Sequence, residues 1–242
     1  MFSNRYIIIY SAIMVLVVAA ALTVVAVQLR PAQQYNQRVE KMQSILASAH
    51  IESTVKNAED LYNKYITTAF VINEAGDKEA NANAFETDLS KENSKAVAER
   101  HLPVFVCIND SGSLYYILPM RGKGLWGPIW GYMAFSSDLK IIVGAMFDHK
   151  GETPGLGAEI DTDKFEDQFI GKSIFNEQGE FVSVKVVKGG APDGDTHAVD
   201  AISGGTITSK GLEDMIRDGL SPYQNFFQQI RDSVSSQNTS EE

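Results

Sequence analysis

The hydrophobic pattern divides the chain near its N-terminus. Ile7 to Val27 forms a run of 21 residues without a charge. A helix rises about 1.5 Å per residue, so this run covers roughly the 30 Å hydrocarbon core of a bilayer. A cleavable signal peptide usually has a shorter apolar region of about 7–15 residues. The pattern therefore predicts that residues 1–30 form a short tail and a retained transmembrane helix.

The next segment is polar, with apolar residues at the spacing of an amphipathic helix. Between residues 33 and 51 these positions are Val39, Met42, Ile45, Leu46 and Ala49. Residues 73–100 contain many Asn, Ala, Glu and Lys residues and few large apolar side chains. We therefore expect residues 31–100 to form a helical stalk, packed on the following domain, and a surface insertion.

From Pro103 onward, short β-branched and aromatic runs alternate with turn residues, which is typical of an antiparallel sheet. The runs are PVFVCIND, SLYYILPM, IWGYMAFSS and LKIIVGAMF. A short helix over KFEDQFIGKSIF, a strand over FVSVKVVKGG and a last helix from Ser209 to Asp218 should follow, with Gly219 as its stop. The fold class predicted is α+β. It comprises one N-terminal transmembrane helix, an antiparallel-sheet domain with flanking helices over residues 101–234, and a disordered tail at 235–242.

Composition and charge exclude several classes of function. The chain has 242 residues, of which 44% are hydrophobic and 21% charged, as in ordinary globular proteins. Its 31 acidic residues outnumber 21 basic ones, and no basic cluster is visible, so we expect no nucleic-acid partner. The single cysteine, Cys107, should be a buried core thiol. The histidines share no ligand spacing, and we predict no metal site and no role for them; they are His50, His101, His149 and His197.

Three glycine-rich segments are candidates for chemistry, and the first is GKGLWG at 122–127. It matches the dinucleotide pattern G-x-G-x-x-G but leads into a strand. That fingerprint requires a helix N-terminus at the pyrophosphate, so the dinucleotide interpretation fails. Two interpretations stay open: a plain hairpin turn, or a turn that presents Leu125 and Trp126 to a flat aromatic ligand.

The second segment is GETPGLG at 151–157. Three glycines and a proline within seven residues predict a tight, preshaped loop with several free backbone N–H groups. Such a nest can hold an anionic or carbonyl edge of a ligand. A long turn between sheet and helix explains the same composition, because clusters of Pro and Gly often mean no more than that.

The third segment is DAISGGTITS at 200–209, directly before the last helix. Gly204 and Gly205 remove side-chain bulk around Thr206, and the N-terminus of the following helix would favour a phosphate. A capping turn explains the same residues. The pattern therefore indicates a possible phosphate site and no catalytic group.

Four segments behind one N-terminal span together resemble a known family, the C subunits of the sodium-translocating NADH:quinone oxidoreductase, Na(+)-NQR. The segments are VDAISGGT at 199–206, GETPGLG, GKGLWG and VKGGAP at 187–192. The resemblance covers the anchor and almost all of residues 102–220. It implies an FMN-binding domain in which FMN is joined by a phosphoester to Thr206. The chain departs from the family at Gly205, where Ala is usual, which adds backbone freedom beside the attachment point.

The resemblance also implies the surroundings of the flavin. The isoalloxazine would lie between Leu125 and Trp126 on one side and the 153–157 loop on the other. That loop comprises Thr153, Pro154, Gly155, Leu156 and Gly157. Lys188 would offset the phosphate charge, while Asp200 and Ser203, with the adjacent glycines, would belong to the motif recognised by a flavin transferase. Such an enzyme is needed because no base beside Thr206 would activate its hydroxyl.

The implied function is electron transfer within a membrane complex. The chain would relay single electrons from NADH toward quinone, coupled to sodium export, with the NADH and quinone steps on partner subunits. It would sit in the bacterial inner membrane with its domain facing the periplasm, although Arg30, Arg38 and Lys41 after the span favour the opposite orientation. Two alternatives remain: the G subunit of the homologous ion-translocating ferredoxin:NAD oxidoreductase, and a membrane-anchored domain that binds a ligand noncovalently.

Overall fold

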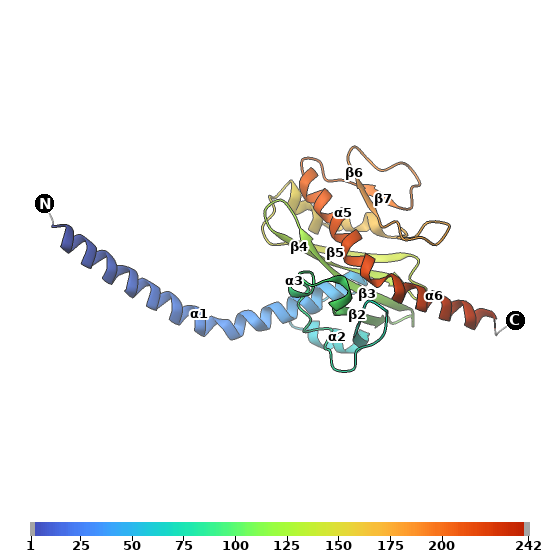
Figure 1. Cartoon of the computed structure of the whole chain (residues 1–242), viewed down its shortest axis with the longest axis horizontal. Helices are drawn as coiled ribbons and strands as arrows, with labels where there is room; N and C mark the ends of the chain where they lie inside the picture. The colour runs from blue at the N-terminus through green and yellow to red at the C-terminus, as the bar shows by residue number, and fades with distance from the viewer. Residues whose placement is uncertain (1–2, 240–242) are drawn as a thin grey trace. The chain divides into compact units, whose positions relative to one another are not determined.

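The computed structural model describes residues 3–239 (Figure 1). The chain divides into two compact units, Met1–Lys41 and Met42–Glu242. The first unit consists of the N-terminal part of helix α1 (Asn4–Ser48), and within the described residues α1 is the one helix long and apolar enough to cross a membrane. Helix α1 continues through Pro31 to Ser48, so residues 31–48 extend the apolar segment as one helix.

The second unit contains a five-stranded antiparallel sheet in the order β1-β2-β3-β4-β5. Its strands are β1 (Ile66–Ile72), β2 (Leu102–Ile108), β3 (Leu114–Lys123), β4 (Pro128–Ser136) and β5 (Ile142–His149). The predicted α+β class is confirmed. The assignment of residues 31–100 to stalk and insertion was wrong for β1, which pairs with β2 as an edge strand. No turn residue separates β1 from helix α2 (Ala58–Tyr65), so the pattern gave no boundary.

Short elements complete the unit. The insertion carries α3 (Leu89–Glu92) and η1 (Val97–Glu99), and after β5 come η2 (Gly157–Asp161), α4 (Asp163–Glu166) and η3 (Asp167–Phe169). A parallel pair, β6 (Lys185–Val187) and β7 (Ala198–Asp200), leads into α5 (Thr206–Leu220), η4 (Ser221–Tyr223) and α6 (Gln224–Thr239). The tail expected to be disordered from residue 235 is helical to Thr239, while residues 240–242 lie outside the described residues.

Both faces of the sheet are covered. Along β3, Ile117 belongs to one buried cluster and Leu118 to the other, as the two-residue period of a strand requires. The first cluster joins the end of α1 and residues near β1 to the sheet through Ile45 and Leu46. The second lies under α5 and α6 and contains Phe227. Cys107 is a buried thiol, as predicted, and burial raises its pKa to about 11.

Glycines bring α5 close to β3 (Figure 1). A β-carbon at Gly122 would lie 2.6 Å from Cβ of Met215, and one at Gly211 would overlap the carbonyl oxygen of Lys123. Gly219, expected to end the helix, lies inside α5 against Met120 instead. This close approach fixes the N-terminus of α5 beside the β3–β4 turn.

Candidate functional site

The three glycine-rich segments meet at the side chain of Glu152, which is 5% exposed. The backbone N–H of Trp126 donates a hydrogen bond to its Oε1 atom over 2.8 Å. The hydroxyl of Thr208 donates to its Oε2 atom over 2.6 Å. One buried carboxylate thus joins the 122–127 turn, the 151–157 loop and the first turn of α5. Glu152 was not among the residues predicted for the site.

GKGLWG is a hairpin turn between β3 and β4. The N–H of Gly124 donates to the carbonyl oxygen of Gly127 over 2.8 Å, and Lys123 pairs with Pro128 at the strand ends. At its tip, Leu125 is 46% exposed and Trp126 is 70% exposed. The hairpin interpretation is therefore correct. A contact of Leu125 and Trp126 with a ligand stays compatible with it, because both side chains are exposed at the tip of the hairpin.

The GETPGLG loop is a turn closed on the carbonyl oxygen of Thr153, which accepts from the N–H groups of Leu156 and Ala158. The N–H of Gly155 donates to Oε1 of Glu159 over 2.9 Å. The N–H groups of Gly155 and Leu156 are thus satisfied within the loop and by Glu159, which leaves fewer free N–H groups in the 151–157 segment than its composition suggests. Thr153 and Pro154 are exposed at the surface of the turn.

The 151–157 loop and the segment before α5 are in contact. Gly204 has φ +76°, and a β-carbon there would lie 2.5 Å from Cδ2 of Leu156. Gly205 has φ −101°, which alanine adopts readily, and a β-carbon there would lie 3.0 Å from Cγ2 of Ile202. The same β-carbon would lie 3.3 Å from the backbone nitrogen of Gly157, so an alanine at Gly205 would require both Ile202 and the 151–157 loop to shift by a few tenths of an ångström.

The hydroxyl groups near α5 differ in exposure. Thr206 is the first residue of α5 and is exposed, as is Ser203. Thr208 and Ser209 are buried, at 1% and 2% exposure. Thr208 donates to Glu152, and Ser209 accepts from the N–H of Ile202 over 3.1 Å.

The N-terminus of α5 carries no side-chain cap, because its N-cap residue is Gly205. Its first turn contains no acidic residue. Uncapped N–H groups and the positive end of the helix dipole make such a terminus suitable for a phosphate. Thr206 places a hydroxyl at that terminus.

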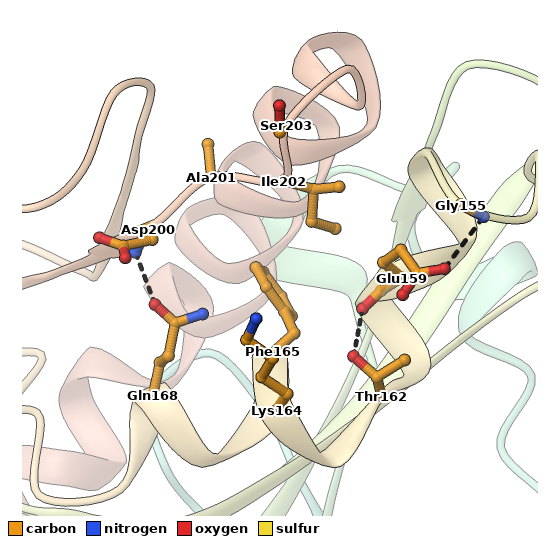
Figure 2. A pocket seen from close by; sticks show the side chains of 10 residues that line it. All are labelled: Gly155, Glu159, Thr162, Lys164, Phe165, Gln168, Asp200, Ala201, Ile202 and Ser203. Atoms are coloured by element: carbon orange, nitrogen blue, oxygen red, sulfur yellow. Dashed lines mark hydrogen bonds between the residues drawn. The ribbon is translucent and has the colours of Figure 1, made fainter.

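A cavity of about 650 Å³ adjoins this junction (Figure 2). Its lining residues are Gly155, Glu159, Thr162, Lys164, Phe165, Gln168, Asp200, Ala201, Ile202 and Ser203. Three of these were predicted site residues: Gly155, Asp200 and Ser203. Ala201 and Ile202 lie inside the DAISGGTITS segment but were not singled out, and the other five lining residues lie outside the three glycine-rich segments. Leu125, Trp126 and Lys188 do not line it.

Asp200 and Lys188 lie at the β6–β7 pair. The Oδ1 atom of Asp200 accepts from the N–H of Ala191 over 2.7 Å, and the backbone N–H of Asp200 donates to Gln168 over 2.8 Å (Figure 2). Asp200 thereby holds the VKGGAP loop beside VDAISGGT. Lys188 is exposed, one residue beyond Val187, the strand partner of Asp200.

His149 supports the 151–157 loop. The prediction that this histidine has no role was therefore wrong. Its Nδ1 atom accepts from the N–H of Glu152 over 3.2 Å, and its buried Nε2 atom lies 3.4 Å from Oδ2 of Asp161. Nearby, Glu166 accepts from the N–H of Phe147 over 2.5 Å. Burial, together with the surrounding aspartates, raises the pKa of Glu166 to about 7.

Comparisons with known proteins match most of this chain. The family model described as "FMN-binding domain" matches residues 124–221, which contain all three glycine-rich segments apart from Gly122 and Lys123. The C subunit of the Na(+)-translocating NADH-quinone reductase of Vibrio alginolyticus is 34% identical over 213 residues, covering 82% of this chain and 83% of the relative. The corresponding Haemophilus ducreyi protein is 31% identical over 237 residues, covering 90% of each chain.

Two crystal structures show the same fold. The C subunit of the reductase from Parabacteroides distasonis is 46% identical with a TM-score of 0.75, covering 82% of this chain and 96% of that chain. The Shewanella oneidensis NqrC structure is 28% identical with a TM-score of 0.70, covering 81% and 99%. The resemblance predicted from the motifs is confirmed, and the chain belongs to the NqrC family, the C subunits of the Na(+)-translocating NADH-quinone reductase.

Proposed function

We propose that this chain is the FMN-carrying, electron-transfer subunit of a Na(+)-translocating NADH-quinone reductase, with FMN joined to Thr206 by a phosphoester. The complex would pass single electrons from NADH toward quinone and couple them to sodium export. The observation that carries the proposal is the exposed hydroxyl of Thr206 at the uncapped N-terminus of α5, where three glycine-rich segments meet. The family match supports it.

The residues around Thr206 fit a flavin phosphate. The N–H groups of the first turn of α5 would hold the phosphate oxygens. Lys188 would contribute a positive charge nearby. Bound FMN supplies the redox chemistry, and the protein supplies position and electrostatics.

Attachment requires a second enzyme. The nearest buried carboxylate, Glu152, is engaged by Trp126 and Thr208, so it is not placed to activate the Thr206 hydroxyl. We therefore expect a flavin transferase to recognise the segment from Asp200 to Thr206, including Ser203, Gly204 and Gly205, in which Ser203, Gly204 and Thr206 are exposed.

The flavin ring has a hydrophobic platform beside this segment. Leu125, Trp126 and Leu156 are 46%, 70% and 42% exposed, which is unusual for large apolar side chains grouped on adjoining segments. We propose that the ring lies between the 125–126 tip and the 153–157 loop. The cavity lined by Gly155 and Ser203 is the second candidate position for the ring, because it opens beside the same loop.

The N-terminal helix would anchor the chain in the bacterial inner membrane, with the domain in the periplasm and other subunits of the complex as partners. Its apolar side chains are exposed along the whole run, as expected for a segment surrounded by lipid. A reporter enzyme that works only in the periplasm should be active when it is fused after residue 242. An inactive reporter would contradict this orientation.

The attachment is tested by fluorescence of the denatured chain after co-expression with a flavin transferase. Wild-type chain should retain a fluorescent flavin on a denaturing gel, and Thr206→Val should lose it while remaining folded. Thr208→Val is the matched control and should keep it. A fluorescent Thr206→Val band would contradict the proposal, and a dark wild-type band would favour the noncovalent alternative.

A further inference from the structure

Glu152 occupies an unusual position for a charged side chain. It is 5% exposed, and its two carboxylate oxygens accept from two different parts of the chain. One donor is the backbone N–H of Trp126, 26 residues away, and the other is the hydroxyl of Thr208, 56 residues away. The carboxylate therefore fixes a hairpin tip to the first turn of a helix.

Two glycines leave room for this carboxylate. A β-carbon at Gly124 would lie 2.5 Å from Oε1 of Glu152, and one at Gly157 would lie 2.6 Å from Oε2. Real β-carbons do not approach oxygen so closely. Any side chain at either position would displace the carboxylate, and at Gly157 it would also overlap the hydroxyl of Thr208, so both glycines are needed for the Glu152 contacts.

The charge of Glu152 is compensated by hydrogen bonds and by α5. A buried carboxylate is costly unless it is paired or hydrogen-bonded. No basic side chain among residues 3–239 forms an ion pair with it. Its partner Thr208 is the third residue of α5, so the carboxylate lies at the positive end of that helix.

We infer that Glu152 is a positioning residue for the flavin: it sets the distance between the attachment point at Thr206 and the apolar platform at Trp126. This inference rests on the proposed function. Sites of this kind depend on a supporting shell that locks the contacting residues in place. A buried negative charge beside the flavin also opposes the addition of electrons, so it should lower the reduction potential.

Two variants separate geometry from charge. Glu152→Gln keeps an oxygen for the Trp126 N–H and removes the charge, while Glu152→Ala removes both hydrogen bonds. Glu92→Ala is the matched control, because Glu92 is also buried, at 8% exposure, and accepts from the His101 N–H over 2.9 Å in the insertion.

In Glu152→Ala, hydrogen exchange of the Trp126 amide should accelerate at least about tenfold, since a charge-assisted hydrogen bond is lost. Native flavin fluorescence should move toward that of free FMN, with the flavin still attached on a denaturing gel. In Glu152→Gln the amide should stay protected and the midpoint potential of the flavin should rise. Glu92→Ala should change none of these quantities.

Unchanged exchange at Trp126 in folded Glu152→Ala would overturn the positioning inference, and an unchanged potential in Glu152→Gln would overturn the effect of its charge. If Glu152→Ala does not fold, the native flavin fluorescence of Thr208→Val, which breaks one of the two links, decides the positioning inference instead: a spectrum like that of wild type would overturn it. Absence of attached FMN from wild-type chain would refute the proposed function instead, and the exchange measurement would still test the link between Glu152 and Trp126.

Discussion

The core under α6 and the glycine-rich end of the sheet differ in which kinds of side chain they bury. In the core, Phe135 and Phe227 are fully buried and their rings pack against each other, with centroids 6.1 Å apart. At the glycine-rich end the large apolar side chain of Trp126 is exposed, while Glu152 and Thr208 are buried. The core thus follows the ordinary division of apolar inside and polar outside, and the other end reverses it.

This reversal points to the same end of the sheet as the glycine-rich motifs do. Leaving apolar surface in water costs about 25 cal/mol per Å², and burying a carboxylate is also unfavourable. Proteins tolerate both together mainly where function requires it. Substitutions in the core should therefore change the free energy of unfolding, and substitutions at the glycine-rich end should change the flavin.

The largest effect on stability is expected in the core. Phe227→Ala should lower the free energy of unfolding by about 3–5 kcal/mol, because it leaves a cavity among buried rings. Urea denaturation measures this change. Folded molecules of the variant should still carry flavin on Thr206; loss of attachment from folded molecules would show that the two regions are not independent.

At the glycine-rich end, Gly155→Val should cost about 1–2 kcal/mol, because Gly155 has φ +75° and a branched residue is strained there. The flavin spectrum should shift toward that of free FMN, with the covalent bond intact. Gly151→Val is the control, since a β-carbon at Gly151 meets nothing within 4 Å and its φ is not positive. If both variants changed the free energy of unfolding and the flavin spectrum equally, backbone strain at Gly155 would not be the cause.

Glu166 should make stability depend on pH. Its pKa is about 7 in the folded chain against 4.5 ordinarily. The contribution of the protonated Glu166 to the free energy of unfolding is therefore complete below about pH 4.5 and is lost as the pH rises through 7. Glu166→Gln should therefore gain stability relative to wild type between pH 5 and 8, by about 1–2 kcal/mol after allowing for its partial exposure. Thermal unfolding at pH 5 and 8 measures this; a constant difference would refute the shift.

The smallest effect on stability is expected for Trp126→Ala, within about 0.5 kcal/mol, because the side chain is 70% exposed. Flavin fluorescence should nevertheless change clearly if the ring lies on Trp126. Val55→Ala, at a residue 58% exposed, is the control. If Trp126→Ala leaves the fluorescence unchanged and Phe165→Leu alters it, the ring occupies the cavity instead.

The sequence was most informative where the signal is local. Short-range patterns marked the apolar run of α1, the strands from Leu102 to His149 and the three glycine-rich segments. The structure contains each of them. The strand β1 was missed because Ile66 directly follows the last residue of α2. Periodicity cannot locate a boundary that no turn residue marks.

The supporting side chains of the site could not be predicted, because their partners are distant in sequence. Glu152 is an ordinary loop residue until the fold brings Trp126 and Thr208 to it from 26 and 56 residues away. The same holds for His149, whose role depends on the backbone of Glu152 and on Asp161. Glycines at 124 and 157 were visible in the sequence, but the carboxylate that they accommodate was not.

The measurement that tests the account most directly is peptide mapping by mass spectrometry of wild-type chain co-expressed with a flavin transferase. An FMN-sized adduct should lie on Thr206 and on no other residue of the peptide, since Ser203 precedes the glycine pair and lies outside the N-terminus of α5, and Thr208 and Ser209 are buried and hydrogen-bonded. An adduct on Ser203, Thr208 or Ser209 with Thr206 unmodified, or no adduct at all, would contradict the assignment.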